Sequence, residues 1–171
     1  MKKMYWTKFV QRRRSDRKLS VEMTPITVRS NSLFQYYIKN QKMDEWIEIK
    51  EELLQKEGSK CWICGIKSNH LHIHEFWELD DSSQIAKLKE LHHLCDMCFK
   101  IKKSEIWFFS NYGREQLKKL DVTKDDLIQH YCKINKCSQE EFDLEFSKEI
   151  INLMEKNKHK WKVDFGDFLK K

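Results

Sequence analysis

The chain contains very little proline and no long apolar run. Pro25 is its only proline, and we find no internal repeat and no low-complexity tract among the 171 residues, which excludes a linker-rich or repetitive architecture. No apolar run approaches the length of a membrane-spanning helix, so we expect a soluble protein without membrane contact. Residues 1–20 also lack the continuous apolar segment of a signal peptide, which predicts a cytoplasmic location and reduced thiols.

Positive charge is concentrated at the amino terminus. The first twenty residues hold eight of the 33 Lys and Arg and one of the 27 acids, a balance of +7, which leaves 25 basic and 26 acidic residues after them. Such a basic segment can bind phosphates by counterion release, and its aromatic side chains can stack on bases. A solvated tail without a partner is the alternative that charge alone leaves open. The candidate nucleic-acid-binding residues of this segment are Arg12, Arg13, Arg14, Arg17 and Lys18.

Two Cys-x2-Cys pairs flank the His-rich stretch of the chain. This spacing lets a tight turn direct two sulfurs at one tetrahedral ion, and Gly65 directly follows the first pair. Disulfides are the alternative, which a reducing compartment disfavours. Cys132 and Cys137 do not fit the spacing of a metal site, so we interpret them as small buried apolar residues. The predicted ligands of a structural zinc ion are Cys61, Cys64, Cys95 and Cys98.

Periodicity and capping signals predict a mostly helical chain. We expect a helix with Asp44 as its N-cap that ends at Gly58, a strand over residues 71–77, a helical period over residues 85–91 and a helix over residues 99–109. Two capping boxes predict helices in the carboxy-terminal third. They are formed by Thr123 with Asp126 and by Ser138 with Glu141.

The fold class that follows is α+β, with a zinc-stabilised ββα module, flanking helices and a helical carboxy-terminal region. We divide the chain into a basic arm (1–25), a linker with a lead-in helix (26–59), the zinc module (60–104) and the helical region (105–171). Adjacent aromatic residues open this last region, and either its own helices or a partner must cover them. We expect the chain's own helices to cover these aromatic residues. These residues are Trp107, Phe108 and Phe109.

The residues between and around the two cysteine pairs resemble those of the HNH endonuclease superfamily, in particular a bacterial group. The similarity rests on Cys61-Trp62-Ile63-Cys64-Gly65, His74-Glu75-Phe76-Trp77-Glu78-Leu79-Asp80-Asp81 and Leu94-Cys95-Asp96-Met97-Cys98. This resemblance implies an HNH-like ββα-metal fold in which zinc is structural. It also implies a second ion, Mg²⁺ or Mn²⁺, beside a histidine that activates water for phosphodiester cleavage. His74 and Glu75 are the candidate catalytic residues, one as metal ligand and the other as base.

Three positions depart from the HNH pattern and predict a degenerate catalytic site. Glu90 stands in place of the middle asparagine, Phe99 in place of the histidine after the second cysteine pair, and Lys102-Lys103 in place of a Lys-His pair. A magnesium site without that histidine lacks a ligand, and a nearby ammonium group opposes a cation. His92 or His93 could fill the vacancy, and His72 with His74 and Glu90 is an alternative metal site. The lysines Lys100, Lys102 and Lys103 are further candidates for contact with nucleic acid.

The sequence therefore supports three functions. The first is an HNH-like zinc-binding accessory protein that binds nucleic acid, DNA rather than RNA, or a nuclease complex such as a CRISPR or other defence or phage effector. The second is an active metal-dependent HNH endonuclease that cleaves DNA. The third is a zinc-stabilised interaction protein that forms a homodimer.

Overall fold

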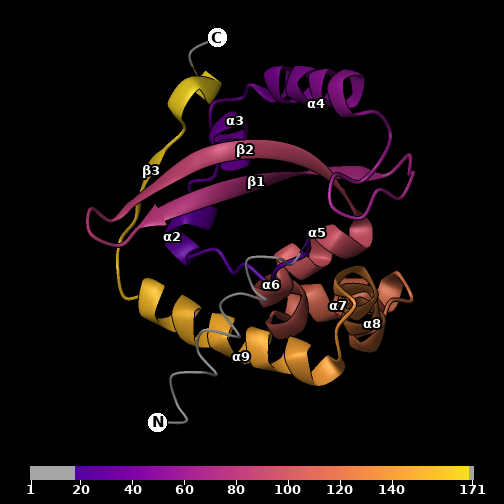
Figure 1. Cartoon of the computed structure of the whole chain (residues 1–171). Helices are drawn as coiled ribbons and strands as arrows, with labels where there is room; N and C mark the ends of the chain where they lie inside the picture. The colour runs from indigo at the N-terminus through magenta and orange to yellow at the C-terminus, as the bar shows by residue number, and fades with distance from the viewer. Residues whose placement is uncertain (1–17, 170–171) are drawn as a thin grey trace.

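A long antiparallel hairpin forms the centre of the computed structural model, which describes residues 18–169 (Figure 1). Strand β1 (Leu71–Asp80) pairs with strand β2 (Ile85–Cys95), and strand β3 (Lys162–Asp164) adds to β2 in parallel, so the strand order is β1-β2-β3. The strand expected over residues 71–77 is confirmed as part of β1. Helix α5 (Asp96–Lys102) begins directly after β2, which gives the order strand, strand, helix between residues 71 and 102.

The helical period expected over residues 85–91 is wrong, because this segment is the first half of β2. The pairing of β1 with β2 is irregular between Phe76 and Trp77, which face Glu90 and Leu88, so no residue of β1 lies opposite Lys89 in the register. Such a bulge shifts the alternation of side chains by one residue. Leu88 and Leu91 are therefore both buried although they lie three residues apart, a spacing that imitates a helix.

Helices lie on both sides of the hairpin. In Figure 1, α3 and α4 lie on one side of the two long strands, and α5 to α9 lie on the other. The last element of the described residues is a short 3-10 helix, η1 (Gly166–Leu169), which follows β3. Helices make up more than half of residues 18–169, and this confirms the α+β, mostly helical class. The other helices are α2 (Ile26–Arg29), α3 (Leu33–Lys39), α4 (Met43–Glu57), α6 (Ser104–Phe109), α7 (Asn111–Lys119), α8 (Lys124–Asn135) and α9 (Gln139–Lys156).

The helix ends agree with the sequence in most places. Both predicted capping boxes are present, at the starts of α8 and α9. Helix α4 ends at Gly58, whose φ of 73° suits glycine. Its predicted N-cap is wrong: Lys42 holds that position, and Asp44 lies in the first turn, where a carboxylate still favours the helix dipole. The helix expected over residues 99–109 is divided into α5 and α6 at Lys103.

The main core joins the cysteine-rich segment to the carboxy-terminal helices. Leu94, Ile101, Leu127 and Tyr131 are buried in one cluster with three of the four predicted zinc ligands. Leu19, Val21 and Met23 also belong to this cluster, so the segment before Pro25 contributes to the core. Within residues 18–169, none of the helices is long and apolar enough to cross a membrane.

The aromatic residues at the start of the helical region are covered mainly from within the chain. Phe108 is buried against Phe146 of α9, and Trp107 packs on the same core. Phe109 also contacts Phe146 but is half exposed. The covering by the chain's own helices, which we expect from the sequence, accounts for two of the three residues.

Candidate metal centre

Four cysteine side chains converge at the junction of the hairpin and helix α5. The first pair lies in the loop between α4 and β1, and the second pair joins the end of β2 to the first turn of α5. One ligand atom from each residue lies within 4.8 Å of the others, and all four are free thiols. In a tetrahedral zinc site with Zn–S bonds of about 2.3 Å, sulfurs are about 3.8 Å apart. The cluster of Cys61, Cys64, Cys95 and Cys98 therefore fits a metal ion such as zinc.

Backbone hydrogen bonds hold the first pair in place. The N–H of Trp62 donates to the carbonyl oxygen of His93 at 2.8 Å, which fixes the loop on β2. The N–H of Gly65 donates to the carbonyl oxygen of Cys61 at 2.9 Å and closes the turn. Gly65 has a φ of 74°, a left-handed conformation that glycine adopts without strain.

The sulfur atoms are crowded. Cys64 Sγ lies 3.6 Å from Cys95 Sγ. Hydrogen bonding with Cys61 raises the pKa of Cys95 to about 12 and also raises the pKa of Cys98. Without a cation the cluster therefore resists ionisation of these two thiols, whereas a divalent ion needs thiolates and stabilises them.

A fifth side chain contacts the cluster. Nε2 of His130, from α8, lies 3.2 Å from Cys98 Sγ. The sequence gives a signal for this position, since His130 follows the buried Leu127 by three residues and so lies on the core-facing side of an amphipathic helix. Cysteine spacing alone does not identify it.

Phe99 occupies the space next to the two histidines of β1. Its ring stacks on His72 with the centroids 4.7 Å apart, and it contacts the ring of His74 edge-on at 6.1 Å. His74 is 4% exposed, and its Nδ1 has no hydrogen-bond partner among residues 18–169. Burial, with the nearby charges of Lys102 and Lys103, holds the pKa of His74 well below its usual value. The imidazole is therefore neutral.

The structure does not bring His74 and Glu75 together. Neighbouring strand residues project to opposite faces of a sheet, and the carboxylate of Glu75 accepts hydrogen bonds from the backbone N–H groups of Leu33 and Phe34, both at 3.0 Å. Burial raises the pKa of Glu75, against the effect of these two donors. Glu75 thus accepts the hydrogen bonds of free N–H groups at the start of α3, whereas His74 faces Phe99 of α5.

The three lysines after the second cysteine pair have partners inside the protein. Lys100 is 3% exposed and lies beside Asp96 and the ring of Trp107. Lys102 is 2% exposed and bonds to Ser20 and Glu22. Lys103 is half-buried, and burial lowers its pKa. Contact with nucleic acid requires ammonium groups at the surface. Those of Lys100 and Lys102 are buried instead.

The alternative metal site does not assemble. Nε2 of His72 pairs with Asp96 at 2.6 Å, and Nδ1 of His74 has no hydrogen-bond partner among residues 18–169. Glu90 instead contacts His92 at 3.2 Å, and Glu57 holds the other nitrogen of His92 at 2.6 Å. Within residues 18–169, the four-cysteine cluster is the one group of three or more ligating side chains close enough to share an ion.

His92 and His93, and the two cysteines outside the cluster, are all packed within the fold. The His92 ring stacks on the half-exposed Trp62 with the centroids 3.8 Å apart, so it does not turn toward Phe99. His93 is fully buried, and neither ring nitrogen has a partner among the described residues. Cys132 and Cys137 pack against the main core, as expected of apolar residues, but they are partly rather than fully buried.

The predicted basic residues of the arm lie mostly outside the described part of the chain. Arg12, Arg13, Arg14 and Arg17 precede residue 18, where the description begins. Lys18 is exposed and borders a hollow of about 430 Å³ beside the first cysteine pair. Lys56 and Lys60 line the same hollow.

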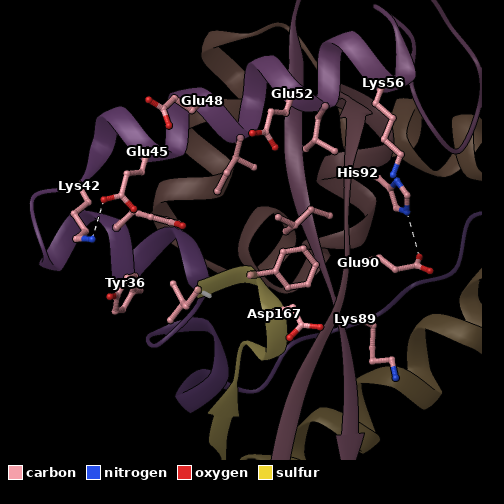
Figure 2. Close-up of a pocket in the computed structure, with 16 residues that line it drawn as sticks. Tyr36, Lys42, Glu45, Glu48, Glu52, Lys56, Lys89, Glu90, His92 and Asp167 are labelled. Atoms are coloured by element: carbon pink, nitrogen blue, oxygen red, sulfur yellow. Dashed lines mark hydrogen bonds and ion pairs between the residues drawn. The ribbon is translucent and has the colours of Figure 1, made fainter. Parts of the chain in front are cut away.

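A groove of about 640 Å³ lies between α4, β2 and η1. Figure 2 shows the side chains that line it, and in Figure 1 helix α4 lies on the side of the hairpin away from α5. Its floor is apolar and includes Ile49, Leu53 and Phe168. Glutamates of α4 and the lysines Lys42, Lys56 and Lys89 also line the groove. Figure 2 shows the contacts of Lys42 with Glu45 and of His92 with Glu90. The sequence does not indicate this groove, because its lining residues come from elements far apart in the chain.

No protein-family model, curated protein or solved structure matches the chain.

Proposed function

We propose that the chain is an HNH-like zinc-binding accessory protein that binds nucleic acid or a nuclease complex and does not cleave. Zinc, held by the four cysteines, would crosslink the loop before β1 to the start of α5 and so supply folding energy rather than chemistry. The strand, strand, helix order around the cysteine cluster supports the HNH-like part of the proposal.

The observation that carries the proposal is the packing of Phe99 on His72 and His74. In the HNH pattern this position is a histidine, and a phenyl ring offers no ligand to a divalent ion. Two ammonium groups near His74, those of Lys102 and Lys103, further oppose a cation there. Both features argue for a module that keeps its structural metal and has lost its catalytic one.

Nucleic-acid binding is supported by the charge of the first twenty residues. Their balance of +7, against −1 for the remainder of the chain, gives the chain one strongly basic segment. The buried positions of Lys100 and Lys102 leave this arm as the principal source of phosphate contacts. DNA is the preferred ligand, and support of a CRISPR, phage or other defence nuclease follows by analogy with the HNH resemblance.

The test combines binding and cleavage in one experiment. Zinc-loaded protein is incubated with supercoiled plasmid, single-stranded DNA and RNA in Mg²⁺, Mn²⁺ or EDTA, with His74→Ala as the control. We expect salt-sensitive binding without cleavage in every metal. Removal of residues 1–17 should weaken binding and flatten its salt dependence by about 0.9 logarithmic units per lost phosphate contact.

Of two other results, the first would overturn the proposal and the second would restrict it to a protein partner. Metal-dependent cleavage that His74→Ala abolishes would make the chain an active HNH endonuclease with an unusual ligand set. If the protein neither binds nor cleaves any of these nucleic acids, nucleic acid is excluded as the ligand and a protein partner remains. A zinc-stabilised homodimer is the weaker candidate, because the chain's own helices cover Trp107 and Phe108.

A further inference from the structure

The contact of His130 with Cys98 links the metal centre to a helix outside the zinc module. Cys98 lies in the first turn of α5, and His130 lies in the last two turns of α8, 32 residues later. The distance of 3.2 Å between Sγ and Nε2 is within the range of a hydrogen bond to sulfur. The two helices pack against each other within the main core.

The position of His130 is set by the packing of α8. A capping box at Thr123 fixes the start of the helix. Leu127, Ile128 and Tyr131, on either side of His130 in sequence, are buried in the cluster that contains Cys61, Cys95 and Cys98. The Tyr131 hydroxyl donates to Glu145 of α9 at 2.8 Å and ties α8 to its neighbour. His130 is therefore held against the sulfur by the fold.

The chemistry of a loaded site decides the direction of this hydrogen bond. A cysteine that binds zinc is a thiolate, which has no proton and can only accept. The hydrogen must then be on Nε2 of His130. A donor of this kind draws charge from the sulfur and restricts its orientation, and loss of such outer partners costs about 10-fold to 100-fold in metal affinity.

We propose that His130 is a positioning residue of the metal centre, whose Nε2–H donates to the Cys98 thiolate and slows the loss of the ion. The inference rests on the zinc site of the proposed function. It extends the metal centre beyond residues 60–104, because a helix of the carboxy-terminal region supplies the hydrogen bond.

The test compares an isosteric pair at one position. His130→Gln keeps an N–H donor of similar reach, and His130→Glu replaces it with an acceptor of the same size. Each variant is loaded with zinc, its metal content is measured, and the rate of zinc transfer to an excess of a coloured chelator is recorded. His130→Ala removes the group, and the exposed His159→Ala is the control.

We expect zinc release about 10-fold to 100-fold faster in His130→Ala and faster still in His130→Glu, with His130→Gln closer to the unmodified protein. Mass spectrometry after thiol alkylation should show the increase in reactivity at Cys98 first. Equal release rates for the Gln and Glu variants would overturn the inference, even where His130→Ala does not fold. Failure of the unmodified protein to bind zinc at all would instead overturn the metal site of the proposed function.

Discussion

Phe99 stacks on His72 with the ring centroids 4.7 Å apart and the planes 22° from parallel. The Nζ of Lys103 lies 4.9 Å from the centroid of the same phenyl ring. In the proposed HNH-like site, the ring therefore fills the space in which an imidazole would bind the second ion, with a cationic group beside it. Filling by an apolar ring and repulsion by an ammonium are separate obstacles to a second metal ion, so they can be removed separately.

We predict that Phe99→His alone binds Mn²⁺ weakly or not at all, whereas Phe99→His with Lys103→Met binds it measurably. The first change supplies a ligand beside His72 and His74, and the second removes the opposing charge. Mn²⁺ binding is measured by electron paramagnetic resonance of the free ion, with Lys103→Met alone as the matched control. Equal binding by Phe99→His with and without Lys103 would show that charge is not an obstacle.

We predict that Cys98→Ser loses zinc and most of the folded state. Binding at a structural zinc site contributes about 10 to 16 kcal/mol in small zinc domains, which is comparable with the whole stability of a domain of about 5 to 15 kcal/mol. Metal content and thermal unfolding are measured together, and EDTA should reproduce the effect in the unmodified protein. Cys132→Ser, a partly buried thiol outside the cluster, should keep its zinc. A Cys98→Ser protein with an unchanged unfolding transition would contradict a structural role.

The features that the sequence predicts correctly are local. The two cysteine pairs and the two capping boxes each lie within four consecutive residues, and the short spacing determines their geometry. The features it misses depend on distant partners. Lys102 is basic and therefore expected at the surface, yet it bonds to Ser20, 82 residues earlier in the chain. Residue type alone does not reveal such a partner.

The strand β2 shows a second limit. Its bulge at Lys89 places Leu88 and Leu91 on one face with helical spacing, so the pattern in the sequence favours the wrong element. Only pairing with β1 resolves the ambiguity, because periodicity over a short apolar run does not distinguish strand from helix. The role of Glu75 is missed for a similar reason, since its partners, Leu33 and Phe34, lie 41 or more residues away.

We predict that Glu75→Ala destabilises the protein by about 2 to 3 kcal/mol, because two backbone N–H groups at the start of α3 lose a charged acceptor. Glu75→Gln keeps one oxygen and should cost about half as much. The free energy of unfolding is measured with denaturant. Glu78→Ala, an exposed glutamate of the same strand, is the control and should change stability by about 0.5 kcal/mol or less. A Glu75→Ala protein of unchanged stability would remove the structural role and return Glu75 to the candidates for catalysis.

We predict that stability falls as the pH drops below the usual pKa of histidine, and that His74 causes part of the fall. Burial lowers the pKa of His74 in the folded protein, so the unfolded chain binds its proton at a higher pH than the folded chain does. The stabilisation is thus complete above about pH 6.5 and is lost toward lower pH, at up to about 1.4 kcal/mol per pH unit for one proton.

The slope is measured as the free energy of unfolding between pH 7.5 and 5.5, with zinc in excess at each pH. His74→Phe, which fills the space with an apolar ring, should reduce this slope by up to one proton. His159→Gln, at an exposed position, should leave it unchanged. Part of the slope should persist in His74→Phe, because burial also lowers the pKa of His93. An unchanged slope in His74→Phe would show that His74 takes up its proton as readily in the folded protein as in the unfolded chain. The assignment of a neutral imidazole to His74 would then be wrong.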